Sequence, residues 1–204
     1  GVKLLCCGKD LKVLKTNDGK RLTVDSHGQQ YDVTVDDILV GVGRTPNVEK
    51  VGLEAAGVHY DNNGIKVNAK LQTSNPNIYA AGDVCSRYKF THAADAMAQI
   101  VIQNALFPHP LNLGYANVDA LVMPWCTFTE PEIAHVGMYE KEAKQKGFEV
   151  ETYTHKLDEI DRAILDGEEE GFARVHIQKG TDKILGATIV AAHAGEMISE
   201  FSVA

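Results

Sequence analysis

The sequence predicts an α/β region followed by an α+β region with an antiparallel sheet. Three observations support this fold class. An apolar strand pattern at residues 37–42 runs into a turn rich in Gly and Pro, as buried strands of α/β sheets do. A long helical pattern covers residues 91–107. The residues after about 118 contain several short strand patterns, flanked by short helical ones.

The first 35 residues are expected to form an antiparallel meander of three strands. Turn signals at residues 17–19 and 26–28 separate three strand patterns at residues 11–16, 21–25 and 30–35. The buried-looking strand at 37–42 follows, and Gly43 to Asn47 take the chain out of the sheet. Small-molecule sites tend to form at such strand exits.

The middle of the chain is expected to contain brief elements before one long helix. A short helix at residues 49–56 would end at Gly57, and brief strands are expected at residues 65–67 and 77–80. From residue 91 to 107 almost every position is apolar or small, so the helix should be mostly buried. A narrow polar stripe along this helix is formed by His92, Asp95, Gln99 and Gln103. The helix is expected to end at Pro108 and Pro110.

The last part of the chain reads as helices on an antiparallel sheet. The expected strands are residues 122–129, 133–136, 148–155, 171–178 and 183–191, with a short helix at 140–146. A boundary near residues 108–118 divides the chain best, and a junction near residue 47 is weaker. The chain begins on a strand, and a helical pattern from Ala194 reaches Ala204 without a cap, so both ends look cut.

Composition argues against nucleic-acid and membrane partners. The 20 Lys and Arg against 28 Asp and Glu give a formal charge of −8, which does not suit phosphate neutralisation or anionic membranes. The longest nearly apolar stretch, residues 184–192, is shorter than the roughly 18–20 residues that span a bilayer. The eight histidines are scattered without close pairing, so no metal site is expected.

The four cysteines are Cys6, Cys7, Cys85 and Cys126, and none belongs to a Cys-x2-Cys motif. A reducing cytoplasm is the simplest setting for so few cysteines. Cys6 and Cys7 would alternate faces on a strand, and adjacent cysteines close only a strained ring. Ordinary strand residues are therefore the favoured interpretation, with a redox pair as the alternative.

The most specific segment spans residues 73–84. It reads as a strand that ends in small residues and is followed by Gly82 and Asp83. Small residues let a ligand approach the backbone, and an Asp at a strand end can accept hydrogen bonds from a polyol. The alternative is a strand that simply ends in a Gly-Asp turn.

Three stretches in order resemble the pyridine nucleotide-disulfide oxidoreductases. The second flavin motif of that family is similar to Thr73, Ile78, Tyr79, Ala80, Gly82 and Asp83. The strand and Gly-Arg-x-Pro-Asn turn between its nicotinamide and flavin domains are similar to residues 37–47. Its dimerisation domain resembles residues 128–137, 184–187 and 194–198, where Pro131 and Glu132 would orient structure and not catalyse. The resemblance covers essentially the whole chain.

The resemblance implies a division into three parts and two cofactors. Residues 1–47 would end an NAD(P)-binding domain, residues 48–116 would be the second part of a partial Rossmann-like FAD-binding domain, and residues 117–204 would form an α+β dimerisation domain. FAD and NAD(P)H are the cofactors expected of the parent enzyme. The parent would form a homodimer through residues after about 118 and act on a small-molecule or disulfide substrate.

The resemblance also assigns cofactor-binding residues. Asp83 would bind the ribityl hydroxyls of FAD, and Gly82 would give the backbone room. Lys89, Phe90, Thr91 and His92 would form the amino end of a helix that points at the flavin ring. A helix amino end is suited to the negative charge of a reduced flavin. A helix-start residue with local hydrogen bonds is the alternative for His92.

Gly43 and Arg44 resemble the family turn that passes near both nicotinamide and flavin. A structural ion pair is the alternative for Arg44.

The family's redox cysteine pair, glycine fingerprints and acid-base histidine have no counterpart in these 204 residues. Gly41 and Gly43 lack the third glycine of a dinucleotide fingerprint, and His193 lies before the segment where the family's base would stand. We therefore expect no catalytic or metal-binding residue here and an isolated chain that is inactive and colourless. A non-catalytic dimerisation module without flavin is the alternative. Residues 157–167 are similar to a mercuric reductase-like subgroup, with dihydrolipoamide dehydrogenase as the runner-up.

Overall fold

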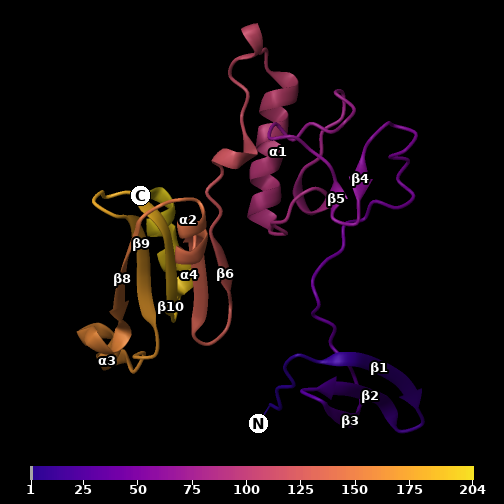
Figure 1. The fold of residues 1–204 in the computed structure, drawn as a ribbon, viewed down its shortest axis with the longest axis vertical. Coiled ribbons are helices and arrows are strands. Elements are labelled where there is room, and N and C mark those ends of the chain that lie inside the picture. Colours follow the sequence, from indigo (N-terminus) through magenta and orange to yellow (C-terminus); the bar gives the residue numbers. More distant parts are fainter. Residues whose placement is uncertain (1) are drawn as a thin grey trace. The chain divides into compact units, whose positions relative to one another are not determined.

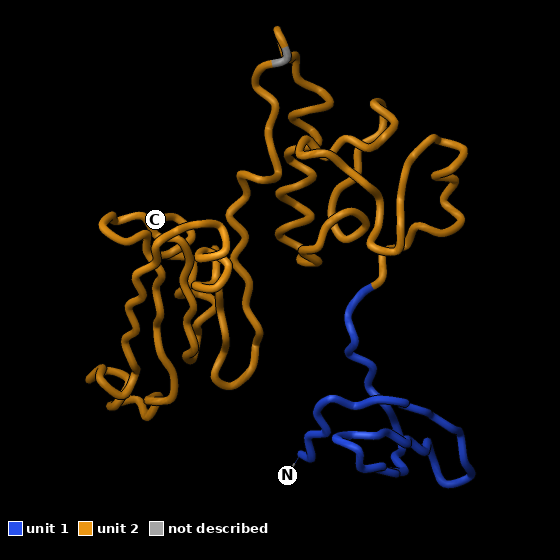
Figure 2. The backbone as a smooth tube through the Cα atoms, in the orientation of Figure 1, with its two compact units in different colours: residues 1–44 blue, residues 45–204 orange. Residues whose placement is uncertain are grey.

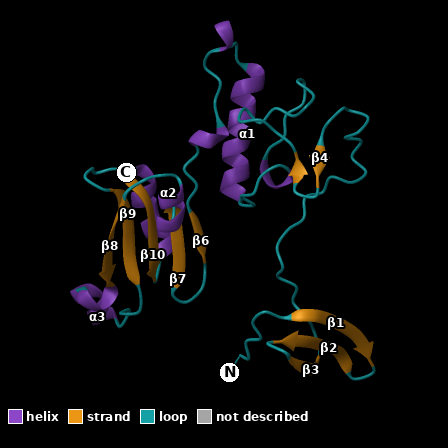
Figure 3. Cartoon of the chain, in the orientation of Figure 1, coloured by secondary structure: helices purple, strands orange, loops and turns teal. Residues whose placement is uncertain are grey.

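The computed structural model describes residues 2–204, except the side chain of Asn112. The chain separates into two compact units, residues 1–44 and residues 45–204 (Figure 2). Figure 3 shows a strand-only first unit and a second unit that contains helices as well as strands. Each unit is described by itself.

The first unit is a three-stranded antiparallel meander (Figure 1). Its strands pair in the order β1-β2-β3, with bounds Lys9–Thr16, Gly19–Ser26 and Gln29–Val35. The meander expected from the turn signals is confirmed. Gly19 is required at the first turn because its φ is +133° and a Cβ there would lie 2.6 Å from the carbonyl oxygen of Val35.

The buried strand expected at residues 37–42 is wrong. This segment is irregular, and the side chains of Leu39 and Val42 are 98% and 90% exposed. An apolar strand stays buried only when neighbouring strands and covering helices supply both faces of the sheet. No strand among residues 2–204 pairs with this segment, so its apolar pattern has no partner here.

The beginning of the second unit is turn-rich. Instead of a helix at residues 49–56, the chain makes separate turns, and Gly57 has a φ of +68°. The strand expected at residues 65–67 is instead β5, Gly64–Ile65, which forms a short hairpin with β4 at Tyr60–Asp61. The strand expected at residues 77–80 is reduced to one bridge between Tyr79 and Gln72. The helix prediction fails because Gly52, with a φ of +75°, interrupts it.

Helix α1 spans Thr91–Leu106, as the sequence predicts. Its buried residues lie on one face and are Ala93, Met97, Ile100 and Asn104. Met97 and Ile100 pack with Leu71 into a small core. The expectation of a mostly buried helix is wrong, since Ile102 and Leu106 are exposed. A helix that is apolar all round needs cover on several faces, and the described residues supply only one.

The last part of the second unit is a five-stranded antiparallel sheet, as expected. The strand order is β6-β7-β10-β9-β8, and the bounds are Trp125–Thr127, Glu132–Gly137, Ile184–Ala191, Phe172–Gln178 and Val150–Lys156. Three helices accompany it: α2 at Glu140–Gln145, α3 at Asp161–Asp166 and α4 at Ala194–Val203. Short 3-10 turns occur at Pro110–Asn112, Val118–Ala120 and Leu157–Glu159.

The core of this sheet domain forms where α4 packs on β7 and β10. Small side chains at Ala134 and Ala187 let Ile198 of the helix approach the strands. A carboxylate oxygen of Glu132, at the start of β7, accepts a hydrogen bond of 2.9 Å from the backbone N–H of Gly195. Glu132 therefore satisfies the amino end of a helix 63 residues away, which agrees with the structural role expected of it.

Two buried histidines lie in the same sheet. His135 of β7 accepts from the Thr188 hydroxyl at Nδ1, 2.9 Å away, and donates from Nε2 to the Gly137 carbonyl, 3.1 Å away. His176 of β9 bonds the Thr152 hydroxyl through Nδ1 at 2.8 Å. Burial lowers the pKa of both rings, because it disfavours the charged imidazolium.

These lowered pKa values predict a loss of stability in mild acid. The two histidines have a higher pKa in the unfolded chain than in the folded one, so the unfolded chain binds protons first as the pH falls. The contribution of the neutral rings to the free energy of unfolding is therefore full above about pH 6.5 and declines below it. Urea unfolding at about pH 7.5 and about pH 5 should show a lower free energy of unfolding at the acid end, and His135→Asn should reduce that difference. The exposed and non-ionisable Asn62 provides the control, since Asn62→Gln should leave the difference unchanged. Equal pH dependence in both variants would contradict the assignment.

Candidate functional site

The Gly-Asp turn singled out by the sequence is the 3-10 turn η1, Gly82–Val84, and not the tip of a regular strand. Gly82 is buried with a φ of +76°, and a Cβ built on it would lie 3.0 Å from the Cβ of Ala94 in α1. Its carbonyl accepts hydrogen bonds from the N–H groups of Cys85 and Ser86. The absence of a side chain at Gly82 therefore lets the first turns of α1 pack directly on the backbone of η1.

A second glycine holds the turn from another side. Gly64 of β5 has a φ of +118°, and a Cβ on it would collide with the carbonyl oxygen of Val84. The hairpin of β4 and β5 therefore approaches the backbone of η1 closely. The two residues that flank Asp83 are thus both approached closely, Gly82 by Ala94 of α1 and Val84 by Gly64 of the hairpin.

The amino end of α1 lacks a side-chain cap among the described residues. Phe90 is the N-cap residue, its side chain makes no capping hydrogen bond, and the first turn contains no acidic residue. The first intrahelical hydrogen bond runs from the N–H of Ala94 to the carbonyl of Phe90. A helix end of this kind presents N–H groups and about half a positive charge, which suits an anionic or electron-rich ligand.

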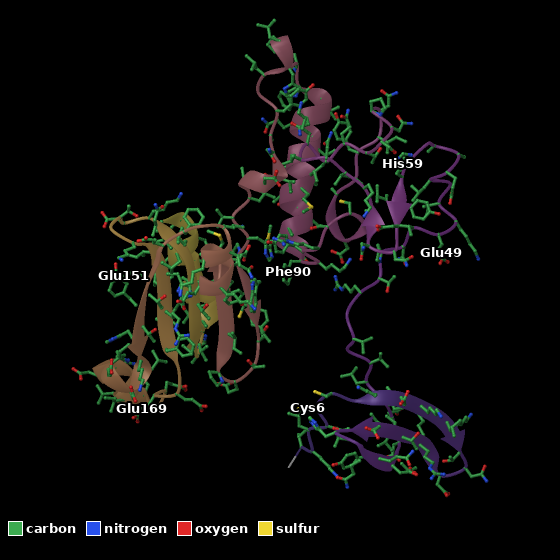
Figure 4. All side chains as sticks on the ribbon, in the orientation of Figure 1. Cys6, Glu49, His59, Phe90, Glu151 and Glu169 are labelled. Carbon is green, nitrogen blue, oxygen red and sulfur yellow. The ribbon has the colours of Figure 1, made fainter. Side chains whose placement is uncertain are left out.

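Lys89 links the turn to the helix start. Its ammonium group donates a hydrogen bond of 3.0 Å to the backbone carbonyl of Asp83. Phe90, which Figure 4 labels at the lower end of α1, stacks on His92 with ring centroids 5.4 Å apart and planes 8° from parallel. These contacts place the predicted residues Gly82, Asp83, Lys89, Phe90, Thr91 and His92 around one junction between η1 and α1.

His92 bonds a distant carbonyl instead of a local helix-start group. Its Nε2 donates to the backbone oxygen of Pro124 at 2.8 Å, 32 residues along the chain and just before β6. The ring nitrogen Nε2 must carry the proton, because a carbonyl only accepts. The sequence did not reveal this contact, since spacing within a helix carries no information about a partner so far away.

Gly43 and Arg44 belong to a different compact unit from this junction. They form the end of the first unit, whereas the other predicted site residues belong to the second. Gly43 has a φ of +99°, so the turn needs glycine for its backbone conformation. The site built here therefore consists of the six residues of the second unit.

A half-open cavity of about 450 Å³ lies beside the turn and was not expected from the sequence. Its walls include Cys85, Arg87, Tyr88, Met97 and Lys146. Burial raises the pKa of the Cys85 thiol to about 11, against a smaller opposing effect from Lys89. Cys85 is therefore a neutral thiol at physiological pH and a poor nucleophile.

Two further findings concern the part of the chain that the structure describes. No group of three or more His, Cys, Asp or Glu side chains in it could hold a metal ion. None of its helices combines the length and apolar character needed to cross a bilayer.

Comparison with known families identifies the class of protein to which this fold belongs. A pyridine nucleotide-disulphide oxidoreductase model matches residues 2–98, and the dimerisation-domain model of that family matches residues 123–204. The chain belongs to the pyridine nucleotide-disulphide oxidoreductase family. Members of this family are enzymes that depend on FAD and NAD(P)H.

Curated relatives carry two different names. A mercuric reductase of Staphylococcus aureus is 38% identical over 188 residues, which are 92% of this chain and 34% of that protein. A dihydrolipoyl dehydrogenase of Bacillus subtilis is 33% identical over 192 residues, 93% of this chain and 39% of that protein. The chain thus spans little more than a third of the length of either relative.

A solved structure agrees with the fold. LpdA from Mycobacterium tuberculosis superposes with a TM-score of 0.81 at 25% identity, covering 96% of this chain and 41% of that one.

Substitution of Gly82 should test the junction. Gly82→Ala adds a methyl group at a positive φ and against Ala94, so the free energy of unfolding should fall by about 2–3 kcal/mol. Gly52 is a matched control with a φ of +75° and open space around it, so Gly52→Ala should lower the free energy by only about 1 kcal/mol. Chemical denaturation of both variants measures the difference. Equal losses would mean that Ala94 does not press on the turn.

Proposed function

We propose that this chain forms the flavin-facing and dimerising part of an FAD-dependent disulfide oxidoreductase. In such an enzyme electrons pass from NAD(P)H through FAD to a redox-active disulfide and then to a substrate. The observation that carries the proposal is the packing of the Gly82–Asp83 turn against the uncapped amino end of α1. Under this proposal residues 1–47, 48–116 and 117–204 belong to the NAD(P)-binding, FAD-binding and dimerisation domains.

The groups at the junction fit a flavin. A carboxylate on a backbone turn, as at Asp83, accepts hydrogen bonds from a polyol such as the ribityl chain. The free N–H groups at the start of α1 suit the electron-rich pyrimidine edge of the ring, and no acidic side chain of the first turn competes there. The bound flavin would supply the hydride-accepting chemistry.

The remaining site residues would position these groups. Lys89 ties the backbone of Asp83 to the helix start, which would hold the turn against the amino end of α1. His92, through Pro124, ties the helix start to the first strand of the sheet domain. The flavin-facing junction and the dimerisation domain would therefore respond to each other. Gly43 and Arg44 are proposed to lie near the cofactors on the basis of family resemblance.

The catalytic disulfide is not assigned to this chain. Burial raises the pKa of Cys85 to about 11, and burial together with Glu132 raises the pKa of Cys126, so neither thiol is an effective nucleophile. We therefore expect no NAD(P)H-dependent turnover from these 204 residues alone. The proposal covers the reaction class. It does not choose between the substrate of a mercuric reductase and that of a dihydrolipoyl dehydrogenase, the two names carried by the relatives.

The parent is proposed to act as a homodimer in the cytoplasm. The match of the dimerisation-domain model to residues 123–204 supports the dimer. Exposed aromatic side chains of the sheet domain, Phe128 and Tyr153, would gain cover in such an interface. The free state of Cys6, Cys7, Cys85 and Cys126 supports a reducing compartment.

A chimera tests the flavin role of Asp83. The corresponding carboxy-terminal segment of the Bacillus subtilis relative is replaced by this chain, so that the relative supplies the preceding part of the enzyme. The chimera should purify with flavin absorbance, and Asp83→Ala should weaken FAD binding at least tenfold, about 1.4 kcal/mol. Asp119→Ala, on a 3-10 turn after the helix, is the matched control and should retain FAD.

Two outcomes would contradict the proposal. Undiminished FAD binding by the Asp83→Ala chimera would remove Asp83 from the site. A folded, dimeric chimera that never binds flavin would favour the second candidate, a dimerisation module without cofactor. That candidate draws its support from the dimerisation-domain match alone.

A further inference from the structure

The adjacent cysteines Cys6 and Cys7 occupy a turn ahead of β1 and not a strand. The sequence-based expectation that they alternate faces of a strand is therefore wrong. Both side chains are exposed, and Figure 4 shows the sulfur-bearing side chain of Cys6 projecting from the ribbon of the first unit. Two exposed thiols thus stand on neighbouring residues of one short turn.

The backbone of this turn is held in place although its thiols are exposed. The hydroxyl of Ser26, a buried residue of β2, donates a hydrogen bond of 2.6 Å to the carbonyl of Cys6. A Cβ on Gly8 would lie 3.0 Å from a methyl group of Val24, so the chain after the cysteines runs close to the same strand. Cys7 has a φ of +55°, a left-handed conformation typical of a turn. Binding a ligand here would therefore order little additional chain.

The other two cysteines offer a clear contrast. Cys85 and Cys126 are half-buried, and burial raises the pKa of each thiol. The thiolate is the reactive form of cysteine, so these two are chemically quiet at neutral pH. Among the four cysteines, Cys6 and Cys7 are the accessible ones.

The spacing of the pair favours a bridging atom over a direct disulfide. Consecutive Cα atoms are about 3.8 Å apart, shorter than the roughly 4.4–6.8 Å that unstrained disulfides need. A larger atom bonded to both sulfurs lengthens the bridge and relieves this strain. Once one sulfur has reacted, the second lies at high effective concentration. A ligand atom that can bond to two sulfurs therefore binds with higher affinity than one that bonds to a single sulfur.

We propose that the Cys6–Cys7 turn is a dithiol binding site for monosubstituted trivalent arsenicals, which are soft electrophiles that form two bonds to sulfur. In the reaction of an arsenic(III) oxide, R–As=O, both S–H bonds break and two As–S bonds form. The oxygen leaves with the two protons as one water molecule. Neither arsenic nor sulfur changes oxidation state, so the step needs no oxidant or reductant. This site lies in the first unit and does not depend on the proposed flavin function.

Titration of the chain with phenylarsine oxide tests the site. Intact mass should show one arsenical per chain with loss of one water, and a thiol reagent applied to the native protein should find two fewer reactive thiols. Cys6→Ser and Cys7→Ser should each weaken binding about 100-fold, because each removes the chelate. The double variant Cys85→Ser/Cys126→Ser is the matched control and should bind like the unsubstituted chain.

Circular dichroism of each variant verifies that the fold is retained, which the exposure of Cys6 and Cys7 favours. Binding that survives in either single variant would overturn the proposal. So would an arsenical bound at Cys85 or Cys126. A chain cross-linked to a second chain through arsenic, seen as a larger species in size-exclusion chromatography, would also overturn it, because the two sulfurs would then come from different turns.

Discussion

The contact between the backbone of Gly82 and the methyl group of Ala94 is the constraint on which the proposed site depends. It lets α1 begin directly against η1, with no side chain between them. Any larger residue at position 82 would push the first turns of α1 away from the backbone of η1. Position 64 in the hairpin likewise requires glycine, because a Cβ there would collide with the carbonyl oxygen of Val84. The site is thus built from backbone approach more than from side-chain packing.

A side-chain hydrogen bond connects the junction to the sheet domain. His92, in the first turn of α1, reaches the carbonyl of Pro124 immediately before β6. In the same domain, Glu132 satisfies the amino end of α4. The two helices therefore begin in different ways. One amino end is satisfied by a carboxylate of its own domain, and the other is left available at the proposed flavin site.

Local signals in the sequence were sufficient for some elements and insufficient for others. The meander, α1 and the five-stranded sheet were predictable because turn residues such as Gly19, and the prolines after α1, act over short distances. The strand at residues 37–42 and the full burial of α1 were predicted wrongly because burial depends on partners that local patterns do not specify. The residue pattern at 73–84 singled out Gly82 and Asp83. The hydrogen bonds from Lys89 to the Asp83 carbonyl and from His92 to Pro124 depend on the folded chain.

The most direct test of the central claim is a measurement of the Gly82–Ala94 approach in solution. In an isotope-labelled sample, a nuclear Overhauser effect between the α-protons of Gly82 and the methyl group of Ala94 reports proximity of these two groups. We expect a strong cross-peak, because a Cβ at position 82 would lie only 3.0 Å from that methyl carbon. A folded protein with both resonances assigned and no such cross-peak would contradict this account of the site.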